Sequence, residues 1–379
     1  MSLPMNEPYY FLPGPVSISK EVRKSFARLP ISHRCSGFLE LFQHIKQRLC
    51  LLVQAKNVEI MLGSGTLAND VIAGQLSLLN SKGLILSNGE FGDRLIDHSE
   101  RFGLSFKSYR RKWGEAFDFN SVKKNVEDDP AIKWIWMVHC ESSTGILNDQ
   151  NALEEICLKN KIHICLDCIS SIGTIPVDLS RIYLASCVSG KGFGAFPGLA
   201  LIFYNCSGIA SNKKLPRYFD LGFYAEQQGI PFTHSSNLIN ALYTALSRFD
   251  SDTVYEETKQ LSLWMRSRMR ELGFQIVAPD DCASPAIITI ALPSSISSET
   301  VGGKMEKKSY FLSYKSKYLL ERNWIQICMM GDCSQKALTK LLYLLTKEAV
   351  KGYGTFEKFK KLQSKVSFRG MAHTAATKK

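Results

Sequence analysis

The sequence predicts an α/β fold, in which the strands of a sheet alternate with helices. Short apolar runs of strand length, bounded by turn residues, alternate with segments of helical spacing. These runs lie at 58–62, 83–86, 134–139, 161–166, 184–188 and 199–204. Several of them end in polar or glycine-rich segments. Because ligands of open α/β sheets bind beyond the carboxyl ends of the strands, these segments are expected to meet in one crevice.

The first run leads into the loop Gly-Ser-Gly-Thr at 63–66, and residues 67–73 then have helical spacing. Backbone amides at the start of such a helix point into the loop and favour a bound phosphate. The loop lacks the Gly-Lys-Ser/Thr of a Walker motif and the Gly-x-Gly-x-x-Gly of dinucleotide-binding folds. It therefore predicts an anion site of another kind.

The next three runs also end in candidate ligand groups. Phe91 follows the strand at 83–86, and its ring serves either a ligand or the core. The run at 134–139 is followed by Cys-Glu-Ser-Ser-Thr-Gly at 140–145. Asp167 follows the run at 161–166, where a lone aspartate would be a helix cap or a turn residue. The convergence of the strand ends favours a ligand role for Asp167.

Lys191 is the most informative residue, because it stands among glycines between two apolar strands. Gly-Lys-Gly by itself also fits a solvated turn. Packing between buried strands, however, desolvates the amine, lowers its pKa and frees its lone pair for attack on a carbonyl. The position therefore predicts a lysine that forms a Schiff base.

Taken in order, these segments carry a family resemblance. The chain resembles class V aminotransferases of the fold-type I pyridoxal-phosphate superfamily, with alanine-glyoxylate/serine-pyruvate and 2-aminoethylphosphonate aminotransferases as the most similar groups. The resemblance extends from about residue 8 to 350. It rests on Pro-Gly-Pro at 13–15, the segments at 63–66, 88–92 and 139–145, Asp167, Lys191, and Pro-Phe-Thr at 231–233.

The resemblance implies a role for each matching residue. Lys191 would hold pyridoxal 5'-phosphate as a Schiff base and move the substrate's α-proton, and Asp167 would keep the pyridine nitrogen protonated. Phe91 would stack on the cofactor ring, and Ser142 would touch its edge. Gly65 and Thr66 of the same chain would bind the cofactor phosphate. Thr233 from the other subunit of a homodimer would complete this phosphate site.

The resemblance also implies the domain organisation. A large pyridoxal-phosphate-binding domain, with a mostly parallel seven-stranded sheet flanked by helices, would span 16–249. A smaller C-terminal α/β domain would span 250–351 and include the N-terminal segment 1–15. Its expected elements are a helix near 252–273, strands at 285–291 and 325–329, and a helix near 335–350. A basic tail, 352–379, would follow, with its end disordered.

The chain departs from the family at Gln326. Relatives usually place there an arginine that binds the substrate's α-carboxylate in a two-pronged ion pair. An uncharged glutamine amide would weaken that contact by about 1.5–3 kcal/mol. Gln326 stays a candidate substrate ligand, and Arg34, Arg322 or Lys315 could supply the missing charge. Arg34, in Pro-Ile-Ser-His-Arg at 30–34, is the other substrate-binding candidate, although it could equally pair across a domain boundary.

Composition narrows the class of protein further. The chain has 379 residues and a net charge of +12, and its segment from 352 onward holds seven basic residues against one acidic residue. The body is therefore only mildly basic, and no aromatic-basic interleaving predicts specific nucleic-acid binding. No apolar signal region precedes Tyr9, and no run of about 18 apolar residues predicts a membrane span.

The cysteines and histidines argue against disulfide and metal chemistry. Eleven cysteines are scattered through the expected strands and helices, which is typical of reduced thiols in a cytoplasmic protein. The pair Cys165 and Cys168 has Cys-x-x-Cys spacing, but a second pair to complete a zinc site is missing and the first thiol lies in an apolar strand. No bound metal is expected.

The sequence thus predicts a class V, pyridoxal-phosphate-dependent aminotransferase. It would move an amino group from a small amino donor to a 2-oxo acid or an aldehyde by a ping-pong mechanism. Two alternatives stay open: a lyase or desulfurase on the same scaffold, and a catalytically silent protein that keeps the fold. The identities of the donor and the acceptor are left open.

Overall fold

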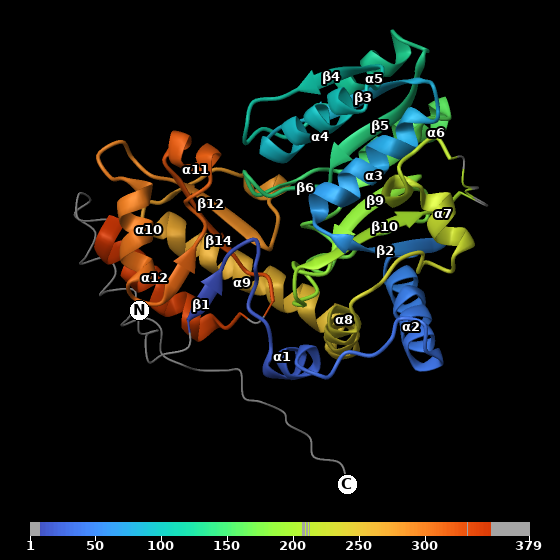
Figure 1. Ribbon diagram of the computed structural model, residues 1–379. Coiled ribbons are helices and arrows are strands. Elements are labelled where there is room, and N and C mark those ends of the chain that lie inside the picture. The colour runs from blue at the N-terminus through green and yellow to red at the C-terminus, as the bar shows by residue number, and fades with distance from the viewer. Residues whose placement is uncertain (1–7, 207–208, 210, 212, 332, 350–379) are drawn as a thin grey trace.

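The computed structural model describes residues 8–206, 209, 211, 213–331 and 333–349. They form a large unit around a seven-stranded sheet and a smaller unit that carries the C-terminal elements (Figure 1). The large sheet has the order β2-β10-β9-β8-β5-β3-β4. β10 is antiparallel to both of its neighbours, and the other adjacent strands are parallel. The predicted mostly parallel seven-stranded sheet is confirmed.

The strands of this sheet coincide with the apolar runs, with one addition. They are β2 (Asn57–Gly63), β3 (Lys82–Ser87), β4 (Phe106–Arg110), β5 (Ile132–Val138), β8 (His163–Asp167), β9 (Leu184–Val188) and β10 (Gly198–Tyr204). β4, at the edge of the sheet, is the strand that the sequence did not predict. β6 (Cys140–Glu141) and β7 (Ile146–Leu147) form a separate two-stranded hairpin just beyond β5.

Helices cover both faces of the large sheet, and the strands supply side chains to both in alternation. In β5, Ile135 and Met137 join one apolar cluster, whereas Trp134 and Trp136 join the other. The first face is covered by α2 (Ser36–Val53), α5 (Phe119–Glu127), α6 (Gln150–Asn160) and α8 (Ser236–Arg248). The second is covered by α3 (Gly65–Ser77), α4 (Glu90–Arg101) and α7 (Leu221–Glu226). α1 (Lys20–Phe26) packs against α8.

The smaller unit is built on a three-stranded antiparallel sheet of order β11-β12-β14. Its strands are β11 (Gln275–Ile276), β12 (Ile287–Ala291) and β14 (Trp324–Cys328). Its helices are α9 (Ser251–Glu271), α10 (Ser298–Glu306), α11 (Lys317–Arg322) and α12 (Gln335–Ala349). A short 3-10 turn lies at Asp280–Cys282, and a second, at Arg217–Phe219, packs against α3 of the large unit. Each element expected here from the sequence has a counterpart within a few residues.

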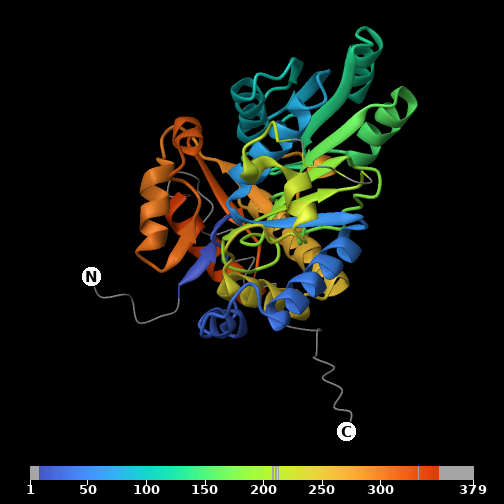
Figure 2. The ribbon, with the colours of Figure 1, turned by 45° about the vertical axis from the view of Figure 1, so that its right-hand side comes forward.

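The N-terminal strand belongs spatially to the C-terminal part of the chain. β1 (Tyr9–Phe11) pairs in parallel with β13 (Tyr310–Leu312), and Phe11 is buried in the same apolar cluster as Met265 and Ile327. Figure 1 and Figure 2 both show this blue strand beside the orange and red elements. This pairing supports the expected placement of the N-terminal segment. The basic tail at 352–379 lies outside the described residues.

Candidate active site

Lys191 follows β9, and its surroundings are too closely packed for an ordinary solvated turn. A Cβ atom at Gly190 would lie 2.7 Å from Pro197 Cα, and one at Gly192 would lie 2.3 Å from the Ile172 carbonyl oxygen. The two glycines therefore allow the lysine loop to pack against neighbouring backbone. Lys191 Nζ donates a hydrogen bond of 3.0 Å to Ser170 Oγ. Burial lowers the pKa of the Lys191 amine, and the nearby charge of Asp167 opposes that shift.

Asp167 ends β8 and is buried, with a hydrogen-bond donor on each oxygen. Its Oδ2 accepts from Asn69 Nδ2 at 2.8 Å, and its Oδ1 accepts from the Ile169 amide at 3.0 Å. Ser186 Oγ donates to Asn69 Oδ1 at 2.7 Å, which turns the Asn69 amide group toward the carboxylate. Burial raises the pKa of Asp167, while the bonds from Asn69 and Ile169 and the charge of Lys191 oppose the rise. The carboxylate is thus fixed in position.

The expected anion site lies beside this pair. α3 begins at Gly65, and its N-cap Ser64 makes no side-chain capping bond. The amides of the first turn therefore face outward without a side-chain cap, next to the exposed Thr66. A Cβ atom at Gly65 would lie 2.5 Å from Ile169 Cδ1 and 3.5 Å from Val188 Cγ1. The helix start thus contacts the segment after Asp167 and the end of β9, as the convergence of strand ends predicts.

Phe91 stands in the first turn of α4, and its ring faces the lysine. Lys191 Nζ lies 5.7 Å from the ring centroid, and Arg94 Cζ lies 5.0 Å from it. The ring also contacts Tyr318 of α11 edge-on, with the centroids 6.5 Å apart. Phe91 is only partly buried. Its position is therefore at the mouth of the site and between the two units of the chain.

A buried carboxylate fixes the start of α4. Glu141 accepts hydrogen bonds from the Gly92 amide at 2.9 Å, from the Ser143 amide at 3.1 Å, and from Ser143 Oγ. Ser143 Oγ in turn accepts from the Glu90 amide at 3.1 Å. Burial raises the pKa of Glu141 to about 7. Ser142 lies in the same turn and is buried.

Gln326 is fully buried in the middle of β14. Its Nε2 donates toward the carbonyl oxygens of Ser142 at 2.5 Å and Ser143 at 3.0 Å, and toward Thr289 Oγ1 at 3.0 Å. The other candidate, Arg34, is exposed in the loop before α2.

The two alternative cations are engaged elsewhere. Arg322 Cζ lies 3.5 Å from the centroid of the Trp113 ring and 5.7 Å from that of Trp324. Lys315 forms an ion pair with Glu306 at 2.8 Å.

Comparison with known proteins assigns this arrangement to a family. No family model matches the chain. The soluble hydrogenase 42 kDa subunit of Anabaena cylindrica is 30% identical over 314 residues, covering 78% of this chain and 81% of that protein. The 2-aminoethylphosphonate–pyruvate transaminase of Lysinibacillus sphaericus is 25% identical over 348 residues, covering 87% and 94%. The chain belongs to the class V aminotransferase family.

Solved structures share the fold of this class V aminotransferase. Ureidoglycine-glyoxylate aminotransferase from Bacillus subtilis matches with a TM-score of 0.83 at 21% identity, covering 93% of this chain and 96% of the other. A cysteine desulfurase from Thermococcus onnurineus matches with a TM-score of 0.74 at 12% identity, covering 90% and 95%. The predicted fold, family and enzyme class are confirmed, and the transaminase relatives favour amino transfer over the lyase alternative.

The cofactor of the class V aminotransferases is pyridoxal 5'-phosphate, as predicted. The residues described above fit it: an amine of lowered pKa, a buried carboxylate, and a helix start whose outward amides suit a phosphate. The sequence pattern pointed to each of these three positions. It missed Asn69 and Ser186, which hold Asp167, and Glu141. One available signal was the polar Asn69 among the mostly apolar buried residues of α3.

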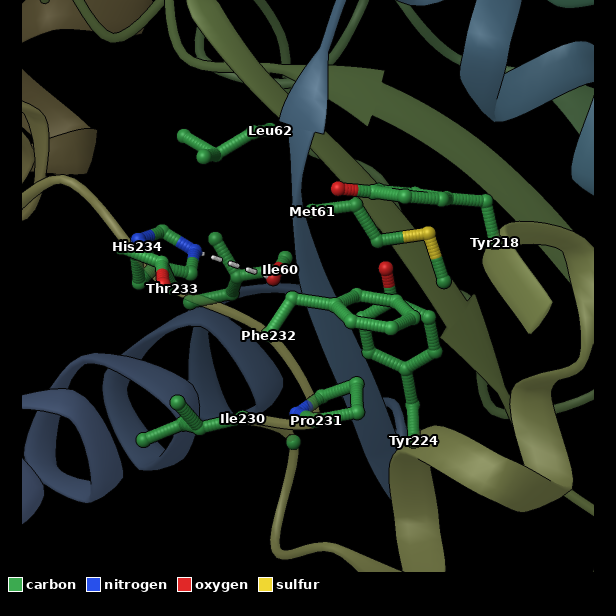
Figure 3. Close-up of a pocket in the computed structure, with 11 residues that line it drawn as sticks. Ile60, Met61, Leu62, Tyr218, Tyr224, Ile230, Pro231, Phe232, Thr233 and His234 are labelled. Carbon is green, nitrogen blue, oxygen red and sulfur yellow. Dashed lines mark hydrogen bonds between the residues drawn. The ribbon is translucent and has the colours of Figure 1, made fainter. Parts of the chain in front are cut away.

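Thr233 lies in a different place from the lysine cluster. It is exposed and lines a small pocket beside β2, with Phe232 and His234 as neighbours (Figure 3). His234 Nε2 lies 3.4 Å from the carbonyl oxygen of Ile60, and the Phe232 ring stacks on Tyr218 with the centroids 4.5 Å apart. The pocket shares no lining residue with the group around Lys191.

Three chain-wide observations complete the description of this aminotransferase. All eleven cysteines are free thiols. Among the described residues, no three histidine, cysteine or acidic side chains gather as a metal site would require. In the same part of the chain, every helix is too short or too polar to cross a membrane.

Proposed function

We propose that this enzyme transfers an amino group from a small amino donor to a 2-oxo acid or an aldehyde in two half-reactions at one site. The observation that supports it most is the placement of Lys191, Asp167 and the start of α3 together beyond the carboxyl ends of the inner strands β8 and β9. Together these residues would supply a base, a carboxylate and an anion site to one catalytic centre.

Each residue has a proposed task toward the cofactor. The amides of Gly65 and Thr66 bind its phosphate, and Asp167 binds its ring nitrogen. Phe91 covers one face of the ring, and Ser142 contacts its edge. Bound pyridoxal phosphate withdraws electrons from the bond that is broken at the substrate's α-carbon.

Lys191 performs two tasks in this proposal. Its amine holds the cofactor covalently, and once released it accepts the proton from the donor's α-carbon. Because burial lowers its pKa, a larger fraction of the amine is neutral and able to accept a proton than for an exposed lysine. Ser170 Oγ, at 3.0 Å from Nζ, orients the amine.

The names of similar proteins indicate the size of the substrates. Relatives and structural neighbours are named for 2-aminoethylphosphonate with pyruvate, alanine with glyoxylate, and ureidoglycine with glyoxylate. We therefore propose a small donor and a short 2-oxo acid as acceptor. We keep the exposed Arg34 as the proposed ligand for an acidic group of the substrate, since Lys315 is held in an ion pair with Glu306.

We also propose a homodimer. Thr233 is exposed, as a residue that contacts a second subunit would be in a single chain. Beside the Arg34 loop, the side chains of Leu29 and Ile31 are 87% and 46% exposed, and a second copy would cover them. Within the dimer, Thr233 would complete the phosphate site of the partner.

A mixed dimer tests this role of Thr233. Thr233→Ala is expected to weaken cofactor binding, and pairing it with a Lys191→Ala subunit should restore affinity at the intact lysine. Unrestored affinity in the mixed dimer, or a monomer by light scattering, would contradict the proposal.

The domain limits and the location of the protein are further proposals. The ranges 16–249 and 250–351, the latter with 1–15, are supported by the separate sheets and by the β1–β13 pairing. A cytoplasmic location is supported by the eleven free thiols.

A half-reaction assay tests the proposed reaction. The purified holoenzyme is mixed with alanine, serine or 2-aminoethylphosphonate in the absence of any acceptor. Amino transfer predicts one oxo product per site and a cofactor left in its amine form, which pyruvate or glyoxylate then restores. Repeated release of ammonia or sulfide without an acceptor would instead identify a lyase or a desulfurase.

A further inference from the structure

Gln326 occupies a position where two parts of the chain meet. It pairs with Thr289 across β12 and β14, and its backbone also exchanges hydrogen bonds with Ser313 at 2.8 and 3.2 Å. Its side chain donates hydrogen bonds to the turn after β6, which carries Ser142 and Ser143. That turn lies shortly after β5 of the large sheet. Ser142 is 184 residues earlier in the chain than Gln326.

The donor capacity of the Gln326 amide is fully used inside the protein. A glutamine Nε2 carries two hydrogens, and three acceptors lie within 3.0 Å of it. The Oε1 atom accepts from the Tyr318 hydroxyl at 3.4 Å. With 0% of its surface exposed, the residue has no donor left to offer a substrate carboxylate.

The contacts of Gln326 continue to the aromatic ring at the mouth of the site. Ser143, whose carbonyl accepts from Gln326, bonds through its hydroxyl to Glu141 and to the Glu90 amide. Glu141 in turn accepts from the Gly92 amide. These two amides flank Phe91.

The packing along this route is tight enough to transmit a displacement. A Cβ atom at Gly89, the residue before α4, would lie 2.4 Å from the Glu141 side chain and 2.5 Å from Ser143 Oγ. A shift of the Ser142–Ser143 turn would therefore move the first turn of α4.

We propose that Gln326 is a positioning residue that ties the three-stranded sheet to the Ser142–Ser143 turn and thereby sets the place of Phe91. It does not bind the substrate. The link to the cofactor rests on the proposed function, since it requires Phe91 to face the cofactor ring. The tie between the two parts of the chain does not require it.

The test compares Gln326→Glu and Gln326→Met with wild type. Glutamate replaces the donor group by an acceptor that faces two carbonyl oxygens, and methionine keeps the length but donates nothing. Gln275→Glu is the matched control, because it makes the same change at an exposed position on β11 of the same sheet. The measurements are the melting temperature without cofactor, the dissociation constant of pyridoxal phosphate, the steady-state kcat and KM, and the hydrogen exchange of the amides at 140–145.

A positioning role predicts that Gln326→Met lowers the melting temperature of the cofactor-free protein by about 5 °C, because two buried carbonyls lose their donor. Cofactor binding weakens by about tenfold. Of the kinetic constants, kcat falls, while KM for the donor changes less than about twofold. Gln275→Glu matches wild type. Hydrogen exchange of the amides at 140–145 speeds up in Gln326→Met and stays as in wild type in Gln275→Glu.

Two results would overturn the proposal. One is a variant with unchanged melting temperature and cofactor affinity but a KM raised about tenfold for donors that carry an acidic group, which would make Gln326 a substrate ligand. The other is unchanged exchange at 140–145. If Gln326→Glu does not fold, Gln326→Met decides. If no donor is turned over at all, the proposed function fails, whereas the melting and exchange data on cofactor-free protein still decide the role of Gln326.

Discussion

The carboxyl ends of β8 and β9 and the strand β14 use their polar groups in opposite ways. Beyond the carboxyl ends of these inner strands, Lys191 has a single described side-chain hydrogen bond, and the amides at the start of α3 have no side-chain cap. In β14, every hydrogen of the Gln326 amide has a protein acceptor. The first region therefore keeps polar groups available for a ligand, and the second uses its polar group to hold the fold. Position in the family pattern alone does not distinguish the two cases.

Replacing Lys191 should cause the largest loss of activity. Lys191→Ala removes both the covalent attachment and the base, and activity is expected to fall by at least about 10²- to 10⁴-fold. Cofactor that survives denaturing gel filtration after borohydride treatment is the direct measurement. Lys159→Ala, an exposed lysine on α6, is the control. Covalent retention in Lys191→Ala would contradict the assignment.

A smaller effect is expected at the carboxylate. Asp167→Asn keeps the shape but removes the charge that holds a proton on the ring nitrogen. The loss of a charged hydrogen bond predicts a decrease of about 10- to 100-fold in kcat. Single-turnover kinetics with saturating cofactor measure it. Wild-type kcat in the variant would mean that Asp167 only caps the segment after β8.

The residues behind the carboxylate should have graded effects. Asn69→Ala removes the 2.8 Å bond to Asp167, and Ser186→Ala removes only the bond that orients Asn69. We expect cofactor affinity to fall by about tenfold in the first variant and by less in the second. Fluorescence titration of cofactor-free protein measures both. A larger loss of affinity in Ser186→Ala than in Asn69→Ala would contradict the proposal that Ser186 acts on Asp167 through Asn69.

The smallest effect concerns the pH dependence of stability at Glu141. Its folded-state pKa, about 7, lies above the ordinary value of 4.5, so the folded protein binds this proton more tightly than the unfolded chain. The resulting stabilisation is present at low pH and is lost as the pH rises from about 4.5 to about 7. Glu141→Gln lacks this loss, so its melting temperature relative to wild type should rise between pH 5 and pH 8.

The exposed Glu155→Gln on α6 is the control for that series and should show no such trend. A constant difference between Glu141→Gln and wild type across the pH range would mean that Glu141 does not titrate between these values.

The sequence predicted the sheet and the residues at its edge because both follow from local pattern. Apolar runs produce buried strands, and parallel strands bring their ends together. β4 was missed because three of its five residues are exposed, so that it lacks an apolar run. Asn69 and Glu141 were missed because their roles depend on partners far along the chain: Asp167 is 98 residues from Asn69, and Gly92 is 49 from Glu141.

Gln326 illustrates the same limit of sequence reasoning, because its role also depends on distant partners. The sequence marked it as a departure from the family pattern, but its hydrogen bonds to Ser142 and Ser143 depend on how two distant segments pack. Tertiary packing therefore decides whether a polar residue in a site serves the ligand or the fold.

Borohydride reduction of the wild-type holoenzyme, followed by proteolysis and mass spectrometry, tests the central claim most directly. Reduction makes the bond between the lysine amine and the cofactor permanent. The arrangement of the site predicts that the added mass is found on the peptide containing Lys191 and on no other. Attachment to a different lysine, or complete release of the cofactor after reduction, would contradict the account.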